Sequence, residues 1–224
     1  MKKIVALMLA LMLCLSMTAM AEVPSKTASD AVGIEVTTEN EVAAGEPAPY
    51  INIVSDLTMT EEELAKYEDL EKLAEAEIAK LEKAESVEDY FGEVKGADGN
   101  AVDLQSLVTP NEDGSEADLS VYEFYGLVAG NYDESMGKVT ATLKLPTPYA
   151  DGEKVGVMVG LVNKTEDAEE EYTIDWTALE GTVETSEDVE TVSSVKVEIE
   201  PELMKAIQDG EALLAIVSKT AVTE

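Results

Sequence analysis

Acidic side chains are the most abundant groups in this chain that could do chemistry, and the first chemistry they suggest is calcium binding. The sequence holds 48 Asp and Glu residues against 15 lysines, and it contains no histidine. An EF-hand loop needs oxygen ligands at positions 1, 3 and 5, a glycine at position 6 and a glutamate at position 12. The stretch Asp98–Asp103 fits positions 1 and 3 only, and a second acidic turn, with Asn111, Asp113, Ser115 and Glu116, lacks the spacing. We therefore expect no metal-binding residues, and we keep weak calcium binding outside the EF-hand pattern as a hypothesis.

Enzyme chemistry has little support in the sequence. Glycoside cleavage needs two carboxylates held about 5 Å or about 7–9 Å apart, and nothing singles out two of the 48 acids. A serine or threonine nucleophile has no histidine to act as its base, and the glycine patterns of phosphate loops and dinucleotide-binding folds are absent. We therefore predict that the protein is not an enzyme and has no catalytic or cofactor-binding residues. Nucleic acid is a poor partner, because a chain with a formal net charge of −33 repels a polyanion.

Two tyrosines in turn-rich stretches, Tyr132 and Tyr149, are candidates for contacting a sugar or a partner protein. An exposed ring at either position could stack on the face of a sugar. The alternative is that each ring plugs an end of the folded domain. Trp176 is different, because it alternates in phase with Ile174 and Ala178. This spacing predicts a core residue.

The first 21 residues have the pattern of a secretory signal peptide. Lys2 and Lys3 precede an apolar run over residues 4–17, and Ala19-Met20-Ala21 supplies a small-x-small cleavage site. The run is shorter than the ~20 residues that span a bilayer. We therefore predict Sec-type cleavage after Ala21 and a secreted, extracellular protein that is not held in the membrane.

The only cysteine, Cys14, lies inside this predicted signal peptide. A lipid anchor on Cys14 is an alternative, but the preceding Leu11-Met12-Leu13 places leucine where lipoprotein signals need a small residue. After cleavage the chain keeps 13 lysines and 48 acids, a net charge of −35, and no disulfide. Its stability must then come from a hydrophobic core.

Residues 22–55 are predicted to be a flexible lead-in, because Ala, Glu, Thr, Val and Pro dominate their composition. Two short β-like pieces, Gly33–Val36 and Tyr50–Val54, leave open that this segment supplies strands that pair with later parts of the chain.

Residues 56–92 are predicted to contain one long, acidic, amphipathic helix, clearest over residues 60–85. Thr60 and Glu63 have the spacing of a capping box. Apolar residues recur at three- and four-residue steps, which places them on one face: Leu64, Tyr67, Leu70, Ala74, Ile78 and Leu81. This face could pack on its own domain, or the helix could stand as a spacer or associate as a short coiled coil. Glu71 at a core position disfavours the coiled coil.

Residues 93–224 are predicted to form a β-sandwich domain. From about residue 119 the hydrophobic period becomes two, and turn-rich stretches separate six strand-like segments. A short helix from Pro201 to Gly210 would cross between the last two strands. Six short strands and one core tryptophan are typical of an antiparallel immunoglobulin-like sandwich. The predicted fold is thus mainly β, with the long helix preceding the sandwich.

Four stretches also resemble uncharacterised exported immunoglobulin-like modules of Gram-positive gut anaerobes: Val121–Tyr125, Tyr149–Val155, Asp175–Gly181 and Gly210–Val217. The resemblance covers about residues 93–224. It implies a surface or secreted β-sandwich module without assigned catalytic residues.

These patterns predict a secreted, non-enzymatic binding or structural module of the cell surface or extracellular space. Its partner would be an unidentified protein or glycan. The alternative is an accessory carbohydrate-binding module, which an exposed aromatic platform including Tyr132 or Tyr149 would distinguish.

Overall fold

A computed structural model describes residues 33–56, 58–111, 113–147, 149–164, 172–185 and 193–219. Strands hold 44% of the described residues and helices 23%, which confirms the prediction of a mainly β protein. The predicted signal peptide, residues 1–21, and its cleavage site lie outside the described residues.

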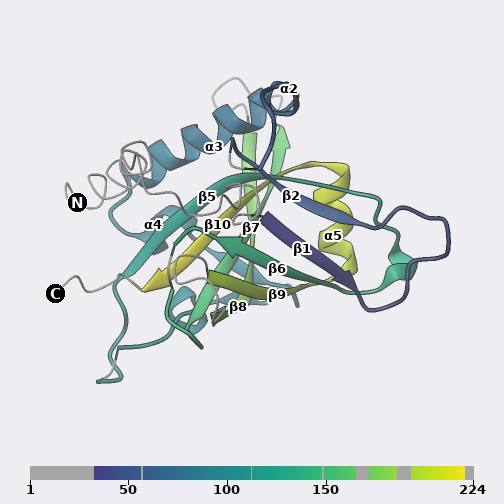
Figure 1. The fold of residues 1–224 in the computed structure, drawn as a ribbon. Helices are drawn as coiled ribbons and strands as arrows, with labels where there is room; N and C mark the ends of the chain where they lie inside the picture. Colours follow the sequence, from purple (N-terminus) through teal and green to yellow (C-terminus); the bar gives the residue numbers. More distant parts are fainter. Residues whose placement is uncertain are drawn as a thin grey trace, which may run out of the picture.

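Ten strands form one sheet (Figure 1). Eight of them follow one another in the order β1-β6-β9-β8-β7-β10-β5-β2, and every pairing along this path is antiparallel. Because β1 and β2 at its two ends come to lie beside each other, the sheet is nearly closed and barrel-like. The strands are β1 (Gly33–Thr38), β2 (Tyr50–Val54), β3 (Val94–Gly96), β4 (Ala101–Val102), β5 (Leu119–Gly130), β6 (Val139–Leu145), β7 (Lys154–Lys164), β8 (Tyr172–Thr185), β9 (Ser193–Ile199) and β10 (Glu211–Lys219).

The predicted immunoglobulin-like sandwich of two sheets is not confirmed. Strand β8 pairs with β7 from Tyr172 to Thr182 and with β9 from Thr182 to Thr185, so the hydrogen bonding continues from one half of the sheet into the other. Gly181 lies at this changeover, and a Cβ atom there would come within 2.7 Å of Val195 Cγ1. The missing side chain therefore lets β9 approach closely where β8 changes partners.

Two strands of the sheet come from the segment predicted to be a flexible lead-in. Strand β1 pairs with β6, and β2 pairs with β5. The flexible prediction is therefore wrong for residues 33–38 and 50–54. The alternative, that short β-like pieces pair with later parts of the chain, describes them correctly.

The single helix predicted over residues 60–85 is two helices, α2 (Glu61–Leu64) and α3 (Glu68–Leu81), and a short helix α4 (Val87–Phe91) follows. The Thr60–Glu63 capping box begins α2 as predicted. Lys66 N–H and Tyr67 N–H then donate to carbonyl oxygens only three residues back, which tightens the turn, and Tyr67 leaves the helical region of the backbone. The helix restarts at Glu68.

Helix α3 lies on the outside of the sheet (Figure 1), where Leu70 and Ala74 are buried against it. Its apolar face is thus covered by its own chain, which excludes the coiled coil considered above. Leu70 and Ala74 belong to a hydrophobic cluster on the outside of the sheet, separate from the core inside it. This outer cluster also includes the aromatic rings of Tyr90, Phe91, Phe124 and Trp176. The ring centroids of Phe91 and Trp176 are 4.9 Å apart. Trp176 is partly exposed at the edge of the cluster.

The main core fills the inside of the sheet, and both ends of the barrel are plugged. Helix α5 (Pro201–Asp209), the helix predicted over residues 201–210, contributes Met204 and Ile207 at the end where β6 begins. The connection after β6 contributes Tyr149 at the other end. The interior is therefore occupied by side chains.

Candidate functional site

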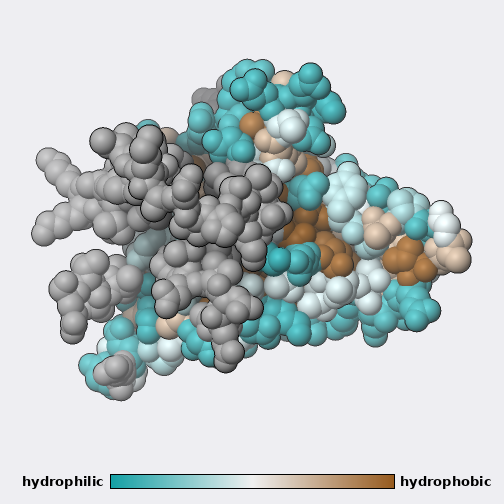
Figure 2. All heavy atoms as spheres, viewed as in Figure 1, coloured by the Kyte–Doolittle hydropathy of each residue, from teal (hydrophilic) through white to brown (hydrophobic). Residues whose placement is uncertain are grey.

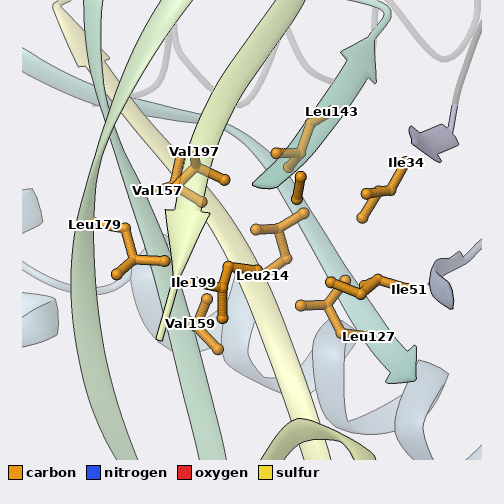
Figure 3. A pocket seen from close by; sticks show the side chains of 11 residues that line it. Ile34, Ile51, Leu127, Leu143, Val157, Val159, Leu179, Val197, Ile199 and Leu214 are labelled. Atoms are coloured by element: carbon orange, nitrogen blue, oxygen red, sulfur yellow. The ribbon is translucent and has the colours of Figure 1, made fainter. Parts of the chain in front are cut away.

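The interior of the barrel contains one small cavity in the described part of the chain (Figure 3). Its volume is about 10 Å³, which is roughly the space of one water-sized sphere. All eight strands of the path contribute apolar side chains to its lining: Ile34, Ile51, Leu127, Ala141, Leu143, Val157, Val159, Leu179, Val197, Ile199 and Leu214. A space this small and apolar is part of the core, with no room for a ligand of substrate size.

The two tyrosines predicted as candidate contacts, Tyr132 and Tyr149, are both buried. Tyr132 donates its hydroxyl hydrogen to Gly137 O at 2.7 Å, and its backbone N–H donates to Gln208 Oε1 on α5 at 2.6 Å. Tyr149 packs its ring edge-on against Tyr122, with ring centroids 6.4 Å apart. Both rings plug an end of the barrel, as the alternative expectation had it, and neither presents a face to a sugar.

A buried carboxylate, Glu123, organises the end of the barrel near Tyr149. Only 3% of Glu123 is exposed. Its carboxylate accepts hydrogen bonds from the Tyr125 hydroxyl and from both the hydroxyl and the backbone N–H of Thr147. Burial raises the pKa of Glu123, and these three donors oppose the rise. The arrangement clamps the connection after β6 to strand β5.

A second buried carboxylate, Glu77 on α3, is 4% exposed. It accepts hydrogen bonds from the hydroxyls of Tyr90 at 2.7 Å and Tyr172 at 2.8 Å, and Lys80 Nζ lies 2.6 Å from its Oε1. These partners come from α4, from β8 and from α3 itself. Glu77 therefore ties the outer helices to the sheet.

The sequence contains a signal for both carboxylates, although neither was predicted to be buried. Glu123 alternates in phase with Val121 and Tyr125, and Glu77 stands three residues after Ala74, on the predicted apolar face. An acid in the phase of apolar neighbours is typical of a buried, partnered carboxylate.

The acids considered for calcium binding form turns. Asp98 accepts hydrogen bonds from the backbone N–H and the side-chain amide of Asn100, at 3.0 and 2.7 Å, and these bonds lower the pKa of Asp98. Asp113 accepts hydrogen bonds from the backbone N–H and hydroxyl of Ser115, which lower its pKa in the same way. No group of three or more potential metal ligands occurs among the described residues. Weak calcium binding stays an untested hypothesis.

The path of paired strands ends at β1 (Gly33–Thr38) and β2 (Tyr50–Val54), which lie beside each other without pairing in the described residues. We call the line between these two strands the seam. Hydrophobic side chains reach the surface there (Figure 2). Ile34 and Val36 of β1 are only partly buried against the core, and Ile34 and Ile51 lie on the same side of the cavity in Figure 3. At the seam, side chains packed against the core are therefore partly exposed.

No family model, curated protein or solved structure matches the chain. None of the helices in the described ranges is long and apolar enough to cross a membrane.

Proposed function

We propose that this protein is an exported, non-enzymatic module that acts through its outer surface, as a binding or structural component of the cell surface or extracellular space. The observation that supports this proposal most directly is the filled interior. The cavity that side chains from all eight strands line holds about 10 Å³, and Tyr132 and Tyr149 are part of the buried core at the two ends. A partner must therefore be met on the outside.

The buried carboxylates support the same proposal. Glu77 and Glu123 are each surrounded by hydrogen-bond donors of the chain itself, and each links elements distant in sequence. Groups engaged in this way stabilise a fold, and a structural role accounts for them without a reaction.

The proposal is tested by thermal melts of residues 22–224 with soluble cell-wall and host polysaccharides and with candidate proteins. A ligand at 100 times its dissociation constant stabilises the folded state by about 2.7 kcal/mol. We expect a protein partner to raise the melting temperature by several degrees. Turnover of any ligand, seen as product in the same samples, would contradict the non-enzymatic part.

Export is tested separately with the precursor in a Gram-positive host. We expect the chain in the culture medium to begin at Glu22, by N-terminal sequencing. Ala21→Tyr, which removes the small residue at the cleavage site, should leave an uncleaved chain with the cells. Equal release of both forms would contradict the proposed export route.

The carbohydrate-binding alternative now depends on another ring, because Tyr132 and Tyr149 are buried. Tyr50 is the large hydrophobic residue with high exposure in the described ranges, at 39%. If a polysaccharide raises the melting temperature of the native chain, Tyr50→Ser should abolish that shift. An unchanged shift in Tyr50→Ser would place the sugar elsewhere.

A further inference from the structure

The seam has two strand edges that are free of strand pairing. In the residues that the structure describes, β1 pairs only with β6, and β2 pairs only with β5. The two strands lie beside each other. Strand direction reverses at each step of the eight-strand path, so β1 and β2 at its two ends run antiparallel. Unpaired N–H and C=O groups at a strand edge are a template for pairing with another chain.

Neither strand contains a lysine, a proline or a bulge, which are three of the features that protect exposed strand edges. Strand β1 is Gly-Ile-Glu-Val-Thr-Thr, and its one charged residue, Glu35, forms an ion pair with Lys144 of β6. Strand β2 is Tyr-Ile-Asn-Ile-Val and has no charge. Figure 2 shows an apolar surface between these two strands. The seam is thus chemically suited to strand pairing.

Strand β1 is held less firmly than the strands in the middle of the path. None of its six residues is fully buried, whereas seven consecutive residues of β10 are. Its departure would break the ladder to β6 and the Glu35–Lys144 ion pair. It would also break the backbone and side-chain hydrogen bonds that join Glu39 and Asn40 to residues 135–138.

The connection that follows β1 is long and exposed. Seven of the nine residues from 41 to 49 are exposed, and Gly45 has a φ of +97°. Nine extended residues span roughly 30 Å. The connection therefore lets β1 reach a neighbouring molecule while β2 stays in its own sheet.

We propose that the slot between β6 and β2 also accepts β1 of a second copy of this chain, so that two copies exchange their first strands. We choose β1 of a second copy because β1 already pairs with β6 within one chain. Residues Gly33 to Thr38 match Lys144 to Val139 in six consecutive pairs, and a second copy offers the same strand with the same side chains. Exchange of an identical element is a low-cost route to dimers, because the exchanged contacts equal the original ones.

The net negative charge of the chain opposes this exchange and makes it depend on salt concentration. Two copies with a net charge of −35 each repel one another. Salt shortens the screening length from about 30 Å at 0.01 M to about 3 Å at 1 M. Exchange therefore increases with salt as well as with protein concentration.

Introduced cysteines provide the test, because residues 22–224 contain every described element and have no cysteine of their own. Thr37 and Thr140 are register partners that point away from the core. Thr37→Cys and Thr140→Cys are purified separately, mixed under reduction at high concentration and high salt, incubated below the melting temperature and then oxidised. We expect a disulfide-linked dimer that joins the two variants.

The control mixture pairs Thr37→Cys with Thr173→Cys, an exposed position on β8 that does not neighbour β1. Strand exchange gives several-fold more linked dimer in the register pair than in this control. Equal linkage in both mixtures would overturn the proposal, because it would show collision or association through another surface.

The second measurement uses an intramolecular disulfide that prevents β1 from leaving β6. The double variant T37C/T140C, oxidised while dilute, fastens β1 to its own β6. Light scattering should then find the locked chain monomeric at concentrations and salt where the native chain forms dimers. A native chain that stays monomeric throughout, or a locked chain that dimerises equally, contradicts strand exchange. Both assays use purified protein, so their failure is distinct from a failure of the proposed export or partner binding.

Discussion

Two buried glutamates differ in what holds their carboxylates, and the difference determines how each contributes to stability. Glu77 has a lysine beside it together with two tyrosine hydroxyls. Glu123 has only neutral donors from Tyr125 and Thr147. The first is part of an ion pair, whereas the second is a desolvated charge compensated by hydrogen bonds alone.

Glu77→Ala should lower the free energy of unfolding by about 2–3 kcal/mol, because it removes a charged acceptor and leaves two tyrosine hydroxyls without their partner. Glu77→Gln should cost less, since its amide oxygen still accepts. Urea unfolding of both variants measures this. Glu75→Ala, at an exposed position on the same helix, is the control and should stay near the native value; a similar loss there would contradict the role assigned to Glu77.

Glu123 should make stability depend on pH with a defined sign. Its pKa is raised in the folded state, so the folded protein holds this proton more tightly than the unfolded chain does. The stabilisation is fully present below the unfolded pKa of about 4.3 and is lost as pH rises through the folded pKa. The other acids contribute almost equally to native protein and Glu123→Gln, so their effects cancel in the difference.

We therefore expect the free energy of unfolding of the native protein to fall, relative to that of Glu123→Gln, as pH rises from about 4.5, just above that unfolded value. Urea unfolding of both proteins across this range is the measurement. A constant difference would show that the three hydrogen bonds balance burial at this site, and one that rises with pH would show that they outweigh it; either would contradict the raised pKa.

At the scale of elements, the packing of α3 depends on a glycine in the strand below it. A Cβ atom on Gly126 would lie 2.7 Å from Leu70 Cγ and 3.2 Å from Val54 Cβ. The helix can approach β5 so closely because this side chain is missing. The sequence predicted the apolar face of the helix from its spacing, but the surface that receives this face was not visible in the helix itself.

Gly126→Ala should destabilise the protein by about 1–3 kcal/mol, because the added methyl group overfills this contact. The matched control is Gly156→Ala in β7, where the nearest atom, Leu107 Cβ, would be 3.4 Å away. Thermal melts should show a clearly larger loss for Gly126→Ala. Equal losses of stability in the two variants would mean that replacing any strand glycine by alanine has this effect, and that the packing of α3 is not its cause.

At the scale of the whole molecule, net charge should govern stability. With 48 acids and 13 lysines in residues 22–224, like charges repel in the folded state. Raising sodium chloride from roughly 10 to 300 mM screens this repulsion and should raise the melting temperature of residues 22–224. A flat response would mean that the repulsion is already relieved in the fold.

Calcium chloride at matched ionic strength separates screening from binding. The turns at Asp98 and Asp113 already use their carboxylates internally, so we expect no rise beyond that of sodium chloride. A further rise would support the hypothesis of weak calcium binding.

The sequence predicted the strands because their alternation is local, but it did not predict how the sheet closes. Val139 to Leu145 alternate equally well in a sandwich and in a barrel. Closure depends on pairings such as that of Val36 with Ala141, which no local pattern encodes. The two buried tyrosines, Tyr132 and Tyr149, were ambiguous for a related reason, since local spacing does not show whether a ring in a turn faces solvent or covers an end of the domain.

Strand β10 is the last described strand in the chain, yet it lies in the middle of the path, between β5 and β7. It joins β5 through eight residue pairs and β7 through seven. During synthesis β5 and β2 therefore lack the strand that hydrogen-bonds them to β7 until residues 211–219 have left the ribosome. For the export proposed above, a chain that folds only after it has crossed the membrane cannot join these two parts of its sheet until β10 has crossed.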